Sequence, residues 1–367
     1  MIRNAKVAAI HGWCRALVAV ATLVPLLAAA QAGPRSWGWI DTQAQFEPGT
    51  PLWQFPDIAA RIVAEMDKHG VAQTFLVPPP QPPASHLPAQ AIQYRYDAKA
   101  LLAAAARHPN RFKVLGGGDI LNAMIHSVRP SEVSDRDKAR FRAAAEEILA
   151  AGAIGFGEVT SSHYALPQMF ARHPFESTAP DHPLLLLLAD IAAERDVPID
   201  IHFDVVPRDM ALPEHLRAAQ ENPRELKENL TAFERFLAHN PKARIVWSHA
   251  GSDPGRQRTL ELMRGLLARH PNLHMSIRMV AVGPFPLTPL TPEGTLRAEW
   301  KALLEEFRDR FFFQTDRFYN ASDALMAFGP RDGFVLTNRV LEQLPEGLAS
   351  ARSEEHTSEL QSLAYLV

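Results

Sequence analysis

Six polar side chains lie at or near the ends of short apolar runs, where they could bind a metal ion or move a proton. They are Gln43, Gln45, Glu158, His202, His249 and Asp316, called here the six strand-end residues. The runs before Glu158, His202 and His249 read Ile-Gly-Phe-Gly, Ile-Asp-Ile and Ile-Val-Trp-Ser. Because side chains alternate along a strand, Gln43 and Gln45 are expected on the same side of one strand. The pattern predicts several strands that each deliver a polar group to one place.

The residue types indicate chemistry at a divalent metal ion. Neutral imidazole, as in His202 and His249, suits Zn²⁺ and related ions. A carboxylate such as Asp316 can take a proton from a metal-bound water, because the metal lowers the pKa of that water. The amide oxygens of Gln43 and Gln45 are neutral and are poorer ligands than imidazole. We therefore expect one divalent ion and a small-molecule substrate. The ligand types favour zinc as the ion.

Strand and helix patterns alternate along the chain, which is typical of repeated β-α units around a parallel sheet. Strands are expected at residues 37–46, 71–77, 112–115, 153–159, 197–203, 244–248, 272–277 and 311–315. Helices are expected at residues 56–69, 96–108, 134–151, 183–195, 226–239, 256–270 and 296–310, with an eighth in the region 323–348. Eight such pairs predict an α/β fold of the (β/α)8 TIM-barrel class. The strand-end residues would then lie at the mouth where the strands end.

The order of these residues resembles the amidohydrolase superfamily, specifically its amidohydrolase-related branch. That family has His-x-His after strand one, Lys or Glu after strand four, His after strands five and six, and Asp after strand eight. The residues that match in identity and order are Glu158, His202, His249 and Asp316. Gln43 and Gln45 stand where the family has its two histidines. The resemblance runs from about residue 37 to about residue 352.

The resemblance implies a role for each matching residue. Asp316 would be the general base and also a metal ligand, and His202 would bind metal. His249 would bind a second metal or, in one-metal members, polarise the carbonyl of the substrate. Glu158 would be a bridging ligand, or a structural carboxylate where one metal is present. The implied reaction is hydrolysis of a small amide, ester or lactone by metal-assisted attack of water. Metal-dependent decarboxylation, and a ligand-binding barrel without turnover, stay open as alternatives.

The two glutamines leave three interpretations of the site open. In the first, a metal binds through His202, Asp316 and Glu158 with weaker help from the amides. In the second, the site is free of metal and Gln43 and Gln45 donate hydrogen bonds to the substrate. In the third, catalysis is lost. Because the spacing and the polarity of the pair survive, the sequence favours a changed site over random decay.

Further candidates lie near the predicted mouth. Arg208 and Arg278 follow the fifth and seventh predicted strands and could bind a carboxylate of the substrate. His163, Tyr164 and His173 lie in the connection 160–181, which is too long for an ordinary β-α loop. These three side chains could line the mouth. The simpler interpretation of each is a solvated or salt-bridging residue.

Composition limits the classes of partner and the number of domains. The 367 residues carry a net charge of −3 with a pI of about 6.6. This chain therefore has no basic excess to indicate binding of nucleic acid. A hydrophobic content of 47% and this length suit one barrel with insertions. A homo-oligomer is compatible with the sequence, which leaves the oligomeric state open.

Both ends of the chain are expected to lie outside a barrel domain of residues 33–351. A basic start, an apolar run over 16–30 and a small-x-small motif ending at Ala32 predict a secretory signal peptide over 1–32. We therefore expect export, to a bacterial periplasm, with no stable membrane span. Cys14 is the only cysteine and would leave with the signal. Residues 352–362 match the translation of a common sequencing adapter. Residues 352–367 are therefore expected to be an artefact, with the natural C-terminus missing.

Overall fold

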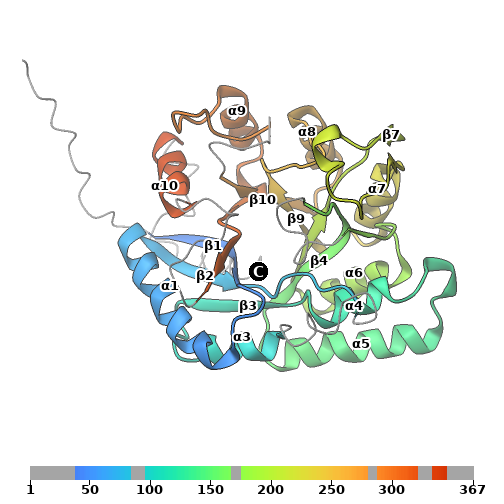
Figure 1. Ribbon diagram of the computed structural model, residues 1–367, viewed down its shortest axis with the longest axis horizontal. Helices are drawn as coiled ribbons and strands as arrows, with labels where there is room; N and C mark the ends of the chain where they lie inside the picture. The colour runs from blue at the N-terminus through green and yellow to red at the C-terminus, as the bar shows by residue number, and fades with distance from the viewer. Residues whose placement is uncertain (1–37, 84–95, 167–174, 280–286, 321–332, 345–367) are drawn as a thin grey trace, which may run out of the picture. The chain divides into compact units, whose positions relative to one another are not determined.

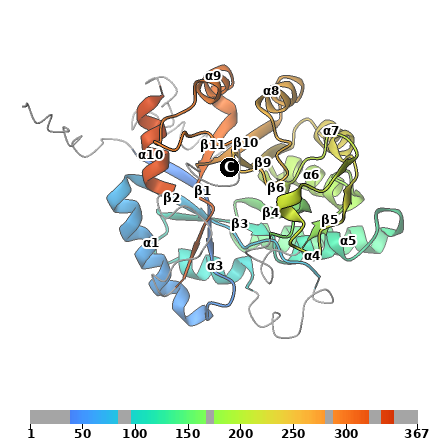
Figure 2. The ribbon, with the colours of Figure 1, turned by 45° about the horizontal axis from the view of Figure 1, so that its top comes forward.

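Parallel strands form a closed ring that positions the candidate site. The computed structural model describes residues 38–83, 96–166, 175–279, 287–320 and 333–344. Within these residues, eight strands pair in the order β1-β2-β3-β4-β6-β9-β10-β11, and β11 pairs with β1 to close the ring. Figures 1 and 2 show the helices around the outside of these strands. The structure confirms the predicted (β/α)8 barrel.

The barrel strands follow the predicted ones closely. Their bounds are β1 Trp39–Phe46, β2 Val71–Leu76, β3 Phe112–Gly117, β4 Gly155–His163, β6 Pro198–Phe203, β9 Arg244–Ala250, β10 Leu273–Arg278 and β11 Phe311–Gln314. Four short strands lie outside the ring: β5 Glu176–Ser177, β7 Met210–Ala211, β8 Glu225–Leu226 and β12 Arg317–Tyr319. The ring closes where Asp41 of β1 pairs with Phe313 of β11.

Apart from α4, the helices also lie where the sequence predicts them. Their bounds are α1 Phe55–His69, α3 Ala98–Ala105, α4 Ile120–His126, α5 Asp135–Ala150, α6 Pro183–Arg195, α7 Leu230–His239, α8 Leu260–Arg269, α9 Ala298–Glu306 and α10 Gly333–Gln343. Short 3-10 turns span Leu52–Gln54, Pro130–Glu132, Glu214–Leu216 and Arg308–Arg310. None of the helices in the described ranges has the length and hydropathy of a membrane-spanning segment.

Local sequence signals explain several helix ends. Ser134, just before α5, accepts a hydrogen bond from the backbone N–H of Asp137, whose side chain accepts one from the backbone of Ser134. This capping box satisfies two donors that the first turn of α5 would otherwise leave unpaired. At the end of α1, Gly70 takes a left-handed conformation with φ of 66°, which glycine adopts without the steric cost of a side chain.

Tertiary packing changes three of the sequence predictions. The connection 160–181 is not wholly a loop, because β4 runs on to His163 and pairs there with β5 in antiparallel register. A seven-residue helix, α4, follows β3 although the sequence pattern did not predict it. Gly116 and Gly117, beyond the predicted end of the third strand at residue 115, also belong to β3.

Some sequence predictions fall outside the described residues. They concern the signal peptide over 1–32, His173, and the adapter-derived residues 352–367. Of the region 323–348, where an eighth helix is expected, the structure describes 333–344 and places α10 there.

Candidate active site

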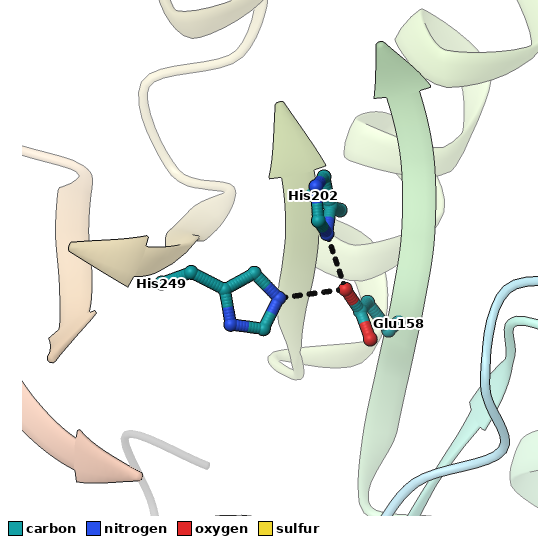
Figure 3. Close-up of side chains that lie close together, drawn as sticks. All are labelled: Glu158, His202 and His249. Atoms are coloured by element: carbon teal, nitrogen blue, oxygen red, sulfur yellow. Dashed lines mark hydrogen bonds and ion pairs between the residues drawn. The ribbon is translucent and has the colours of Figure 1, made fainter. Parts of the chain in front are cut away.

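The carboxylate of Glu158 is the centre of the site, and four side chains from other strands point to it. His202 Nδ1 lies 2.6 Å and His249 Nε2 lies 2.8 Å from Oε1 of Glu158, as Figure 3 shows. The amide nitrogens of Gln43 and Gln45 donate to the other oxygen, Oε2, at 2.7 Å and 2.9 Å. Strands β1, β4, β6 and β9 therefore bring five of the six strand-end residues together.

Burial makes these contacts strong. Gln43 and Gln45 are 0% and 1% exposed, and Glu158 is 3% exposed. Burial alone would raise the pKa of the Glu158 carboxyl. The imidazoles of His249 and His202 outweigh that effect and hold this pKa well below its usual range. Glu158 therefore carries its negative charge at neutral pH.

His202 lies between two carboxylates. Its Nδ1 faces Glu158, and its Nε2 lies 3.8 Å from Oδ1 of Asp204. Burial opposes a positive charge on His202, but the carboxylates of Asp204 and Glu158 outweigh it and raise the pKa of His202 to about 10. Asp204 is buried and also accepts a hydrogen bond of 2.9 Å from the backbone of Tyr164. This arrangement fixes the orientation of the ring, as outer partners of metal-binding histidines do.

Asp316 lies on the far side of His249 from Glu158. Its Oδ2 is 3.6 Å from His249 Nδ1 and 3.2 Å from Arg278 Nη1. Both His249 and Asp316 have positive φ angles, 62° and 48°, which turn their side chains at the strand ends. The backbone N–H of Asp316 donates to the carbonyl of Gln43 at 3.0 Å, so β1 fixes this residue too.

Two buried groups hold the strand ends around Asp316 and His249. Asp41 accepts hydrogen bonds from the backbone N–H and the hydroxyl of Thr315, both at 2.8 Å. Burial raises the pKa of Asp41 to about 7, against the effect of these hydrogen bonds. Gln314 Nε2 lies 2.6 Å from His249 Nδ1. These contacts fix the ring of His249 on one side and the backbone before Asp316 on the other.

The residues present fit one divalent ion. Glu158, His202 and His249 each offer a ligand atom, and these atoms lie within 4.8 Å of one another. One carboxylate and two imidazoles match the ligand number and type of a catalytic zinc site that keeps a position open. Asp316, predicted to be a ligand as well, is not part of this group of three. Within the described ranges, the amide oxygens of Gln43 and Gln45 are buried and have no hydrogen-bond partner.

The structure places the other predicted site residues at varied distances from this centre. Arg278 is 12% exposed at the side chain and pairs with Asp316. His163 is buried at the end of β4, and its ring centroid lies 4.7 Å from that of His202. Tyr164 is buried in a small apolar cluster with Val206 and Leu212, rather than lining an open mouth. Arg208 is exposed on the loop between β6 and β7.

Three residues that hold the site were missed in the sequence: Asp41, Asp204 and Gln314. Each lies two positions from one of the strand-end residues Gln43, His202 and Asp316. Side chains two positions apart share one face of a strand. A search of the positions two residues before and two residues after each strand-end residue would therefore have found them.

A cavity of about 560 Å³ is lined by residues other than those of this centre. Its lining comes from the segments that follow β1, β2 and β3, and includes Leu52, Gln81, Ile120 and Met124. None of the six strand-end residues lines it.

Solved structures show only a distant likeness. A variant of the organophosphorus hydrolase from Deinococcus radiodurans is 13% identical over 86% of this chain and 90% of its own, with a TM-score of 0.48. The aminofutalosine deaminase from Helicobacter pylori is 13% identical over 86% of this chain and 72% of its own, with a TM-score of 0.44. Amidohydrolase 2 from Bifidobacterium longum subsp. infantis is 12% identical over 77% and 84%, with a TM-score of 0.30. These likenesses are too distant to carry an activity over to this chain.

Sequence comparison is more specific. No curated protein matches the chain. A family model described as Amidohydrolase matches residues 40–348, a span that includes all six strand-end residues. The chain therefore belongs to the amidohydrolase family.

Proposed function

We propose that this protein is a hydrolase that adds water to the carbonyl carbon of a small amide, ester or lactone. Membership of the amidohydrolase family supports an enzyme in general terms. The observation that carries the finer proposal is the convergence of Glu158, His202 and His249, with the Asp316 carboxylate 3.6 Å beyond the His249 ring. Glu158, His202 and His249 would hold one divalent ion, and these ligand types favour zinc.

The proposed reaction uses two groups on opposite sides of the His249 ring: the ion that Glu158 would hold, and the carboxylate of Asp316. When bound, a divalent ion at Glu158 supplies positive charge that makes a water molecule more acidic. Asp316 is the other carboxylate among the six strand-end residues and would take the proton from the attacking water as the oxygen of that water forms a bond to the carbonyl carbon. The same carboxyl then gives the proton to the leaving nitrogen or oxygen as the carbon–heteroatom bond breaks. Arg278, paired with Asp316, holds the base in place.

Metal analysis and turnover test this proposal together. The protein is purified without a histidine tag, its metal content is measured, and a panel of small amides, esters and lactones is assayed. We expect about one divalent ion per chain and turnover that is lost on dialysis against a chelator. An active protein without metal would instead support the metal-free site. Bound ligands without turnover, from the same panel, would support a ligand-binding barrel.

A further inference from the structure

The two oxygens of Glu158 have different partners. Oε1 faces the imidazoles of His202 and His249, at 2.6 Å and 2.8 Å. Oε2 accepts the two amide N–H groups of Gln43 and Gln45, at 2.7 Å and 2.9 Å. The two ends of one carboxylate are thus divided between the group that fits an ion and a pair of glutamines on β1.

The two glutamines occupy both hydrogen-bond acceptor positions of Oε2 of Glu158. A carboxylate oxygen has about two lone-pair positions for acceptance, and Oε2 receives two donors. Gln43 and Gln45 are 0% and 1% exposed, so bulk water does not compete for this oxygen. Amide N–H groups are the positive ends of dipoles, and they oppose the approach of a cation from their side.

The backbone of β1 sets the position of both amides. The two side chains share one face of the strand because they are two residues apart. This strand pairs with β2 on one side and with β11 and β12 on the other. The carbonyl of Gln43 also accepts the backbone N–H of Asp316. The paired backbone of β1 therefore holds both side chains on the face that points to Glu158.

We propose that Gln43 and Gln45 are positioning residues that hold Glu158 by Oε2, leave Oε1 alone to bind metal, and limit the site to one ion. This inference rests on the proposed function, because it assigns the glutamines a role toward the ion that the hydrolase would use. The amide N–H groups of Gln43 and Gln45 occupy Oε2 of Glu158, the oxygen that a second ion would otherwise bind.

Titration with Co²⁺ tests the role of the amides. The full chain, without a histidine tag, is titrated by calorimetry and by visible absorption at one pH, because ligand protonation competes with metal. The double variant Gln43→Met with Gln45→Met keeps the size of the side chains and removes the donors. We expect one Co²⁺ per natural chain. The double variant should bind one ion about 10- to 100-fold more weakly, the usual effect of losing outer-shell partners of a ligand. Its absorption spectrum should also change, because Glu158 is then free to bind through both oxygens.

Two further variants complete the comparison. Gln43→His with Gln45→His replaces the donors by metal ligands, and should bind two Co²⁺ per chain. Asn272→Leu is the control, because Asn272 is a buried amide that donates to the carbonyls of Leu237 and Ala243, at 3.0 Å and 3.1 Å, and its hydrogen bonds reach none of the six strand-end residues. It should keep the Co²⁺ affinity of the natural chain. If the double methionine variant does not fold, each single variant should still bind Co²⁺ at least about 3-fold more weakly.

Three results would overturn the inference. The first is an unchanged Co²⁺ affinity in the methionine variants, and the second is two ions in the natural chain. The third applies if the natural chain binds no Co²⁺, a result that would contradict the metal part of the proposed function. The contact between the amides and Glu158 is then measured by nitrogen-15 NMR, with the two side-chain NH₂ signals assigned by their loss in Gln43→Met and Gln45→Met. Both signals should shift in Glu158→Gln, and signals that stay in place would refute the contact.

Discussion

Arg278 Nη1 lies 3.2 Å from Oδ2 of Asp316, and both side chains are nearly buried, at 12% and 10% exposure. The pair joins the end of β10 to the residues just after β11. Arg278, considered in the sequence as a clamp for a substrate carboxylate, also has a carboxylate partner within the protein. The pair fixes the proposed base next to the His249 ring.

Replacement of Asp316 by asparagine separates the role of base from that of ligand. Asp316→Asn should lower kcat by about 10²- to 10⁴-fold, the usual contribution of a general base. Its Co²⁺ affinity should change by less than about 3-fold, because Asp316 is outside the group of three ligand residues. Kinetics and metal titration on the same preparation check both. A tenfold or greater loss of affinity would show instead that Asp316 is a ligand.

Loss of Arg278 should destabilise the fold, because it leaves a nearly buried carboxylate without its partner. Arg278→Met is expected to lower the free energy of unfolding by about 3 kcal/mol. The double variant Arg278→Met with Asp316→Asn should recover part of this loss, since the unpaired charge is removed as well. Urea unfolding of the natural chain, both single variants and the double variant gives the coupling. Additive losses would mean that the two side chains do not interact.

His274 makes the stability of the protein sensitive to acid. Burial, with help from the positive charge of Arg310, lowers its pKa from 6.5 to about 4. The folded protein therefore keeps His274 neutral while the unfolded chain takes up a proton. The stability from this group is full above about pH 6.5 and is lost as the pH falls toward 4. Between pH 7 and pH 4, the free energy of unfolding of His274→Gln should fall by about 3 kcal/mol less than that of the natural chain. Equal losses in urea titrations at the two pH values would contradict this.

Gly118 is required because other backbone atoms approach it closely. A Cβ added there would lie 2.5 Å from the carbonyl oxygen of Pro78 and 2.6 Å from that of Glu158. Gly118→Ala should therefore lower the free energy of unfolding by more than about 2 kcal/mol and displace Glu158, reducing metal affinity. Gly265→Ala is the control: its added Cβ meets the flexible end of Arg269, and alanine favours helix α8 by up to about 1 kcal/mol. Similar stabilities for the two variants in thermal unfolding would count against the close approach.

The fold could be predicted because each β-α pair has its own local signal. Runs such as Ile-Val-Trp-Ser-His249, and the capping residue Ser134, show strands and helices without reference to the rest of the chain. The short helix α4 was missed because seven residues are too few for a clear helical period. The extension of β4 to His163 depends on pairing with β5, which residues 160–163 do not reveal by themselves.

The site was predictable in its members but not in its contacts. Strand-end position was sufficient to select Glu158, His202 and His249. Their mutual distances depend on the closure of the barrel, and so does the hydrogen bond between Gln43 and Glu158, which are 115 residues apart. No local pattern shows that the two amides donate to the carboxylate rather than to a substrate or an ion.

Closure of the ring between β1 and β11 also sets when the site can form during synthesis. The hydroxyl of Thr315 donates to the carbonyl of Gln43 across 272 residues of chain. At a synthesis rate of about 5–20 residues per second, Gln43 leaves the ribosome roughly 15–55 s before its partners near Asp316. During that interval the edge of β1 that pairs with β11 has no final partner, and this edge can pair with other chains. A nascent chain that stops before β11 therefore exposes a strand edge and lacks Asp316, the proposed base, at the same time.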